Sequence, residues 1–187
     1  NTAAAIVAHE EIEGLDVVEL NHRVIETAPQ FAASNGNVHR DPRVRFIHDD
    51  GRRYLALSPQ RYDLITAEPP PPTQDGVYRL YSREYYRQVL AHLTAQGRFS
   101  QWLPIAQLSV QAVDRIVATF LDVFPHAMLF TGYGRELILI GGSQQLDLPL
   151  IARRMNFAPS IAADLARLGV ATPLALFARI LKGDAGL

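Results

Sequence analysis

Three acidic positions in the first half of the chain each follow a short, mostly apolar run. Glu19 ends "LDVVE", Asp50 follows "VRFIHD", and Glu68 ends "YDLITAE". A carboxylate with two accessible oxygens can accept both hydroxyls of a ribose, and a short acid beside a bare glycine can accept from the exocyclic amine of a purine. Glu19 fits the first role and Asp50 with Gly51 the second, which together outline an adenosine. Glu68 would then lie beside the group attached to the ribose, where a reaction would take place.

The structural alternative for each acid is a place at the start of the next helix. Acids after strands commonly cap helices or interact with the helix dipole. For any single acid the two interpretations are equally well supported. Three such acids in successive units favour a ligand site.

Glu68 is followed by four consecutive prolines, Pro69 to Pro72. Proline cannot donate a backbone hydrogen bond, and it restricts the preceding residue to an extended conformation. The run therefore predicts a stiff exit from the strand that holds the Glu68 carboxylate in place. A rigid spacer or a docking surface for a partner is the alternative for the prolines.

Strands and helices alternate along the chain and must position these acids. Parallel strands are expected near residues 16–20, 44–48, 62–67 and 98–103, and an antiparallel hairpin near 127–141. The opening helix is expected to run to about Ile12, and the segment from Leu148 onward has helical spacing. Hydroxyl or amide side chains at the expected helix starts predict N-caps; these residues are Asn21, Ser82, Ser109 and Thr172.

This alternation predicts a doubly wound α/β domain with a mostly parallel sheet and a C-terminal antiparallel hairpin. In such sheets, ligands bind outside the carboxyl ends of the strands. We expect a nucleoside-binding domain over residues 1–145 and a helical extension over residues 146–187.

Composition narrows the class of protein. The 187 residues are 48% hydrophobic and 20% charged, which suits one globular domain with a core. The net charge of −1, without blocks of one sign, does not favour nucleic acid or direct membrane contact. The chain has no cysteine, and its six histidines are scattered, so we expect no metal site. The expected location is the cytoplasm, with a membrane tether in a longer protein left open.

Five segments in order, "VVELN", "HDDGRRYL", "YDLITAEPPPP", "GVYRLYSREYY" and "QWLP", resemble the spermidine synthase family. The resemblance covers nearly the whole chain and implies a class I methyltransferase-like fold. It also implies decarboxylated S-adenosylmethionine as aminopropyl donor and a small-molecule amine as acceptor. Carried over by position, Glu19 matches the ribose-binding acid, Asp50 with Gly51 the adenine-binding pair, and Glu68 the catalytic base.

The resemblance also suggests acceptor contacts at three further positions, Tyr81, Gln101 and Tyr133. For Tyr81 a place in the core is the favoured alternative, and Gln101 and Tyr133 could equally serve in packing. The chain does not begin with Met, and the first strand and glycine-rich loop of the family are not in it. We therefore expect an internal portion of a longer protein, with homodimer formation left open.

Two departures from the family concern the acceptor. The second acid that holds the cationic acceptor in the family is Pro71 here, and the base is Glu68 where the family has Asp. Arg79 and Arg83 lie in the following loop, with only Asp75 to balance them. These features argue against putrescine as the acceptor.

Three functions stay open on the sequence. The first is aminopropyl transfer to an amine. The second is an adenosyl-binding domain without transfer, in a regulatory or membrane-transport-associated role. The third is methyl transfer from S-adenosylmethionine to a small molecule.

Overall fold

The structure is a computed structural model that describes residues 2–132, 134–155 and 159–182. The chain divides into two compact units. The first unit comprises Asn1–Ser58 and Asn156–Arg167, and the second comprises Pro59–Met155 and Leu168–Leu187.

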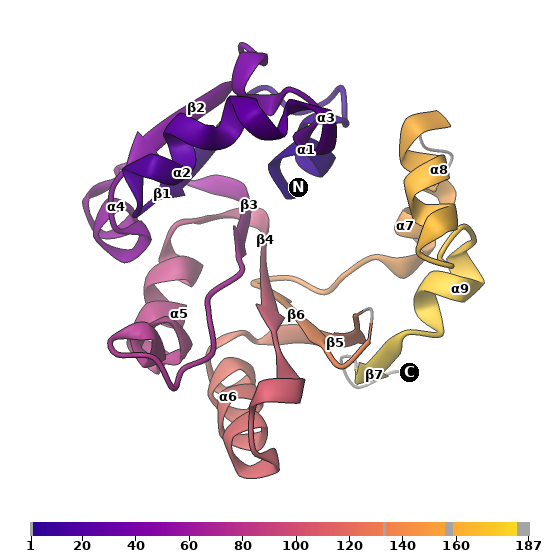
Figure 1. The fold of residues 1–187 in the computed structure, drawn as a ribbon. Coiled ribbons are helices and arrows are strands. Elements are labelled where there is room, and N and C mark those ends of the chain that lie inside the picture. The colour runs from indigo at the N-terminus through magenta and orange to yellow at the C-terminus, as the bar shows by residue number, and fades with distance from the viewer. Residues whose placement is uncertain (1, 133, 156–158, 183–187) are drawn as a thin grey trace. The chain divides into compact units, whose positions relative to one another are not determined.

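Helices and strands alternate through most of the chain (Figure 1). The strands are β1 (Leu15–Glu19), β2 (Val44–His48), β3 (Tyr62–Ala67), β4 (Leu93–Leu103), β5 (His126–Thr131), β6 (Leu137–Gly142) and β7 (Ile180–Lys182). The α-helices are α1 (Thr2–Val7), α2 (His22–Thr27), α3 (Ala32–Asn35), α4 (Gly51–Leu57), α5 (Arg83–Ala91), α6 (Val110–Val123), α7 (Leu148–Arg154), α8 (Pro159–Arg167) and α9 (Pro173–Phe177). Short 3-10 helices cover Ala28–Phe31, Val38–Arg40, Val77–Tyr81 and Ile105–Gln107.

The first unit contains a two-stranded parallel sheet of β1 and β2. Arg43, just before β2, fastens the end of α1 to this sheet. Its guanidinium donates to the backbone carbonyls of Val7, His9 and Ile12 and to the Asp41 carboxylate. The hydrogen bonds from Arg43 lower the pKa of Asp41 to about 2. Arg43 thus joins the end of α1, the segment after it and the start of β2 through polar contacts.

The second unit contains a five-stranded sheet in the order β3-β4-β6-β5-β7. β3 and β4 are parallel, whereas β6 is antiparallel to β4 and to β5, and β7 is antiparallel to β5. The predicted strands, their parallel pairing and the predicted hairpin are therefore confirmed.

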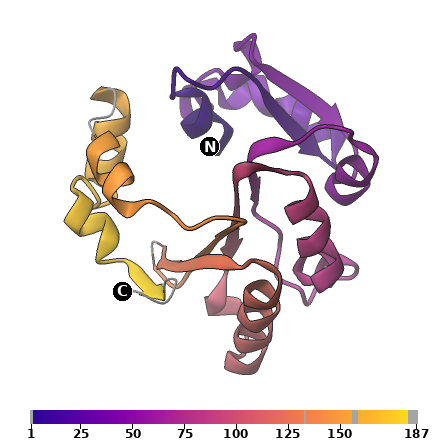
Figure 2. The same ribbon diagram turned by 180° about the vertical axis from the view of Figure 1, so that it is seen from behind.

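Aromatic rings fill the space between this sheet and the helices α5 and α6, which lie on the same face of it (Figures 1 and 2). Tyr86, Phe99, Phe120 and Phe124 are almost fully buried. The Phe120 and Phe124 ring centroids lie 4.5 Å apart, and Tyr86 lies 5.2 Å from Phe120. Gly141 on β6 permits this packing, because a Cβ there would lie 2.5 Å from Cγ of Phe124.

Several boundaries differ from the predicted ones. α1 ends at Val7 instead of Ile12, and β4 begins at Leu93 instead of residue 98. The C-terminal segment holds the expected helices but also β7, which the helical spacing did not indicate. β7 forms through pairing with β5, about fifty residues earlier, and such long-range pairing leaves no local signal. The predicted boundary between residues 145 and 146 stays a prediction.

All four predicted helix caps are confirmed. The side chains of Asn21, Ser82, Ser109 and Thr172 each accept a backbone hydrogen bond at the start of α2, α5, α6 and α9. Among the described residues, none of the helices combines the length and the apolar character needed to cross a bilayer.

Candidate functional site

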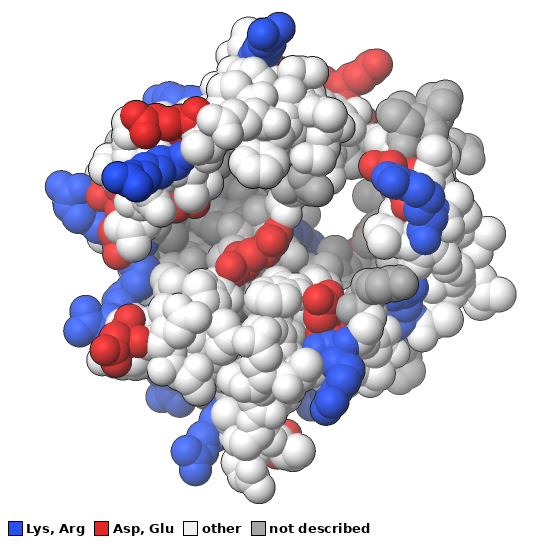
Figure 3. Space-filling view, viewed as in Figure 1, with Lys and Arg blue, Asp and Glu red and all other residues white. Residues whose placement is uncertain are grey.

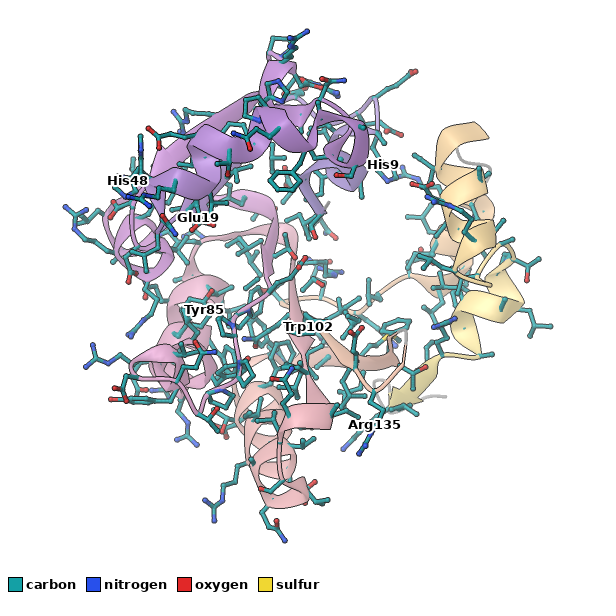
Figure 4. The ribbon with its side chains drawn as sticks, in the orientation of Figure 1. His9, Glu19, His48, Tyr85, Trp102 and Arg135 are labelled. Carbon is teal, nitrogen blue, oxygen red and sulfur yellow. The ribbon has the colours of Figure 1, made fainter. Side chains whose placement is uncertain are left out.

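Glu19 is the last residue of β1 and lies at the carboxyl edge of the two-stranded sheet (Figure 4). It pairs in register with His48, the last residue of β2. The backbone N–H of Asp49 donates to the Glu19 carbonyl at 3.2 Å. The sequence-predicted acids Glu19 and Asp50 are thereby brought to the same edge of one sheet.

Asp50 is the N-cap of α4. Its Oδ1 accepts from the backbone N–H groups of Arg52 at 2.8 Å and Arg53 at 3.0 Å. The structural alternative for this acid is therefore correct, and the cap leaves part of the carboxylate for another role. Within the described part of the chain, hydrogen bonds reach only Oδ1 of Asp50. Gly51, the first residue of α4, has open space where a Cβ would lie.

Glu19 is held in a similar way. Its Oε1 accepts from the backbone N–H of Asn21 at 2.8 Å, and no hydrogen bond from a described residue reaches Oε2. Each of the two acids thus has one oxygen fixed by backbone donors and one without such a bond. This arrangement can accept hydroxyl and amine donors from a ligand, and the residues present fit the adenosyl group that the sequence predicts.

Charged side chains near these acids are paired. Arg53 contacts Asp49 at 2.7 Å, and Arg45 contacts Asp16 at 2.8 Å. Acidic and basic side chains are interspersed on the face drawn in Figure 3. The expectation that only Asp75 balances Arg83 is wrong, because Asp122 on α6 forms an ion pair with Arg83 at 2.9 Å.

β3 covers Tyr62–Ala67, the predicted range, so Glu68 is the first residue after this strand of the second unit and not its last residue. Ala67 pairs in register with Gln101 on β4, so the exposed Glu68 begins beyond the paired region at the carboxyl end of both strands. The cap of α5 is supplied by the Ser82 hydroxyl, which accepts from the Tyr85 backbone N–H. Glu68 is therefore placed by the strand end and the prolines that follow it.

Tyr81 lies at the end of the 3-10 helix Val77–Tyr81 and is only 5% exposed. Its hydroxyl donates to the carbonyl oxygens of Pro70 at 2.9 Å and Pro69 at 3.2 Å. Burial raises the pKa of Tyr81 to about 12, so the hydroxyl keeps its proton at neutral pH. The proline run is thus tied to the buried interior of the second unit.

Gln101 is fully buried on β4. Its Nε2 donates to the Leu80 carbonyl at 3.1 Å, and its Oε1 accepts from the Tyr86 hydroxyl at 2.7 Å. Burial raises the pKa of Tyr86 well above its usual range. Both ends of the Gln101 amide therefore have partners within the protein.

The sequence analysis did not predict the hydrogen bond between Tyr86 and Gln101. The sequence did contain a signal. Phe99, Gln101 and Leu103 follow at every second position and so share the buried face of β4, and a buried amide needs hydrogen-bond partners. The sequence-predicted Glu68, Tyr81 and Gln101 are thus linked within the second unit. Tyr133 lies outside the described residues. Among the residues described, no cluster of three or more His, Asp or Glu could hold a metal ion.

Comparison with known proteins places the chain in a family. The family model of the spermine/spermidine synthase domain matches residues 1–138. A polyamine aminopropyltransferase of Corynebacterium efficiens is 42% identical over 106 residues, which cover 54% of this chain and 20% of that protein. The chain spans between a fifth and about half of the length of the curated relatives that it matches.

Solved structures agree on the fold. A spermidine synthase in complex with the transition state analogue AdoDATO has a TM-score of 0.70 at 17% identity, over 96% of this chain and 61% of that one. Human methyltransferase-like protein 13 in complex with SAH has a TM-score of 0.59 at 19% identity, over 93% and 76%. The predicted class I methyltransferase-like α/β fold is thus confirmed. With the family model matching most of its length, this chain belongs to the spermine/spermidine synthase family.

Proposed function

We propose that this chain carries the nucleoside-binding and catalytic residues of an aminopropyltransferase. The donor is decarboxylated S-adenosylmethionine, and the acceptor is a small-molecule amine. The observation that supports this most directly is the position of Glu68, an exposed carboxylate directly after β3 on a loop tied down by Tyr81. A carboxylate held in this way is suited to take a proton from an attacking amine.

In the proposed reaction, the amine nitrogen forms a bond to the propyl carbon attached to the sulfonium of the donor. The bond between this carbon and sulfur breaks, and sulfur keeps the electron pair and loses its positive charge. The proton released by the amine passes to the Glu68 carboxylate and then to solvent. The products are an aminopropylated amine and a neutral adenosyl thioether.

The first unit supplies the contacts to the adenosine part of the donor. Glu19 accepts from the ribose hydroxyls, and Asp50 accepts from the adenine amine. Gly51 leaves the space that the adenine ring needs, because its Cα carries no side chain. Each role uses an oxygen or a surface that the contacts within this unit leave accessible.

Pro71 is the feature that separates this chain from ordinary spermidine synthesis. It stands where the resemblance places a second acid for the cationic acceptor, so we expect putrescine to be a poor acceptor. Introducing the acid, Pro71→Asp, should increase transfer to putrescine. The same feature favours a second candidate function, an adenosyl-binding domain without transfer.

The proposal is tested with the full-length protein, decarboxylated S-adenosylmethionine and a panel of amines, by measuring product formation. Glu68→Gln should lower transfer by about 10²–10⁴-fold while nucleoside affinity stays close to that of the parent. Asp63→Asn is the matched control, since it changes an exposed acid to an amide on β3 and should leave transfer unchanged.

Full activity of Glu68→Gln would remove this residue from the mechanism. A parent protein that binds methylthioadenosine but transfers to no amine would replace the proposal with the binding domain. Methylated amines formed from S-adenosylmethionine would point instead to methyl transfer.

A further inference from the structure

The proline loop, residues 69–72, leaves Glu68 with an unusual support. Its prolines have no backbone N–H groups, so the loop cannot hold itself in place by donating hydrogen bonds. Their fixed backbone φ angles keep the segment stiff, but stiffness alone does not set the direction in which the segment leaves β3. Donors outside the run that bind its carbonyl oxygens can set that direction, as the Gln74 backbone N–H does locally at Pro71.

The Tyr81 hydroxyl provides such a contact. It donates to the carbonyls of Pro69 and Pro70, the two residues that directly follow Glu68. Glu68 therefore lies between two fixed points, the last pair of β3 with β4 on one side and the Tyr81 anchor on the other. Pro69 is itself buried, so its carbonyl has little access to water as an alternative donor.

Tyr81 is in turn positioned from the same strand that pairs with β3. Gln101, which is in register with Ala67, donates to the carbonyl of Leu80, the residue next to Tyr81. The Tyr86 hydroxyl fixes the other end of the Gln101 amide. The contacts thus form a continuous chain within the second unit. It runs from β3 to its partner β4, from β4 to the 3-10 helix, and from this helix to the proline loop that follows Glu68.

We propose that Tyr81 is a positioning residue whose hydroxyl holds the proline loop and thereby sets the position of the Glu68 carboxylate. The inference rests on the proposed function for its catalytic part, and on the loop contacts for its structural part. It gives Tyr81 a role different from the expected contact with the acceptor, because the hydroxyl is used within the protein.

The test is Tyr81→Phe in the full-length protein, which removes the hydroxyl and keeps the buried ring. Tyr78→Phe is the matched control, since it is the same change in the same 3-10 helix at a side chain that is 57% exposed. Two quantities are measured, the amide hydrogen exchange of Glu68 and residues 73–77, and the kcat and KM of transfer.

For Tyr81→Phe we expect exchange of these amides to rise about tenfold, because the loop opens more often. A displacement of about 1 Å at a reacting group can cost about a hundredfold in rate, so we expect kcat to fall about ten- to a hundredfold. The KM for the donor should stay within about twofold, because its binding residues are in the first unit. Tyr78→Phe should change neither quantity.

Unchanged exchange in Tyr81→Phe overturns the anchor, whatever the activity. Faster exchange with unchanged kcat overturns the positioning of Glu68. If the parent has no transfer activity and exchange still rises in Tyr81→Phe, the proposed function fails while the anchoring role of Tyr81 is supported.

Discussion

The two units hold their candidate functional residues in different ways. In the first unit the acids are fixed by donors two or three residues away in the sequence, as in the hydrogen bonds from Asn21 to Glu19 and from Arg52 to Asp50. In the second unit the partners are far apart in the sequence, with Gln101 and Leu80 separated by 21 positions. The first arrangement is local and partly exposed, and the second is buried and depends on the whole sheet.

The two units also differ in how many of their apolar side chains are buried. Among the described residues of the first unit, only Val38 and Leu55 are buried apolar side chains, and they keep 5% and 6% exposure. In the second unit Phe99 and Phe120 are completely buried at 0%. Changes at the acids of the first unit should therefore affect ligand binding without unfolding the protein, whereas changes in the buried network of the second unit should affect stability directly.

The largest effect that tests this comparison is expected at the acids of the first unit. Glu19→Gln and Asp50→Asn each retain the oxygen that accepts the local backbone hydrogen bonds, so the free energy of unfolding should change by less than about 0.5 kcal/mol. Each loses the charged acceptor that we propose for the nucleoside, and such a loss typically costs about 1.5–3 kcal/mol, or roughly ten- to a hundredfold in affinity. Calorimetric titration with methylthioadenosine measures this loss.

Glu13→Gln is the control for these variants, because it makes the same change at an exposed acid of the first unit. Its affinity should equal that of the parent. Parent-like affinity in both Glu19→Gln and Asp50→Asn would mean that these acids serve only as local structural acceptors.

The second unit should respond in the opposite way. Gln101→Leu leaves the buried Tyr86 hydroxyl and the Leu80 carbonyl without their partner, and Tyr86→Phe leaves the Gln101 amide oxygen without its donor. Each change should lower the free energy of unfolding by about 1–3 kcal/mol. The double variant should lose less free energy of unfolding than the sum of the two single losses. Both partners of the Tyr86–Gln101 hydrogen bond are then removed, so neither a donor nor an acceptor of that bond is left unpaired.

Denaturant unfolding of the single and double variants measures these losses. Gln96→Leu is the control, since Gln96 is an exposed glutamine on the same strand. Strict additivity of the two single losses would show that the Tyr86 and Gln101 side chains do not act as a pair.

The same contrast explains what the sequence could predict. Glu19 and Asp50 could be proposed from the sequence because an apolar run, an acid and a turn are neighbours in the chain. The strands β1 to β6 carry alternating or apolar patterns of the same local kind. The anchor from Tyr81 to the prolines and the pair of Tyr86 with Gln101 depend on how β3, β4 and α5 come together. The strand β7 likewise exists only through its partner β5. Such contacts are specified by tertiary packing, so a local pattern can indicate that Gln101 is buried but does not identify its partner.

The smallest expected effect concerns Gly51, where binding and stability should move in opposite directions. A Cβ at Gly51 would meet no other atom within 4 Å, and its backbone φ is not in the left-handed region, so Gly51→Ala fits without strain. Alanine at the first position of α4 should leave the free energy of unfolding unchanged or raise it by up to about 1 kcal/mol. If the adenine ring approaches this backbone, the added methyl group should lower nucleoside affinity about tenfold, or about 1.4 kcal/mol.

Gly14→Ala is the matched control, because a Cβ at Gly14 also meets nothing within 4 Å and this residue has no proposed contact with the ligand. Calorimetry and thermal unfolding of both variants separate the two effects. Equal nucleoside affinity in the two variants would place the adenine away from Gly51, and a loss of stability in Gly51→Ala would show that this turn is not as open as its surroundings indicate.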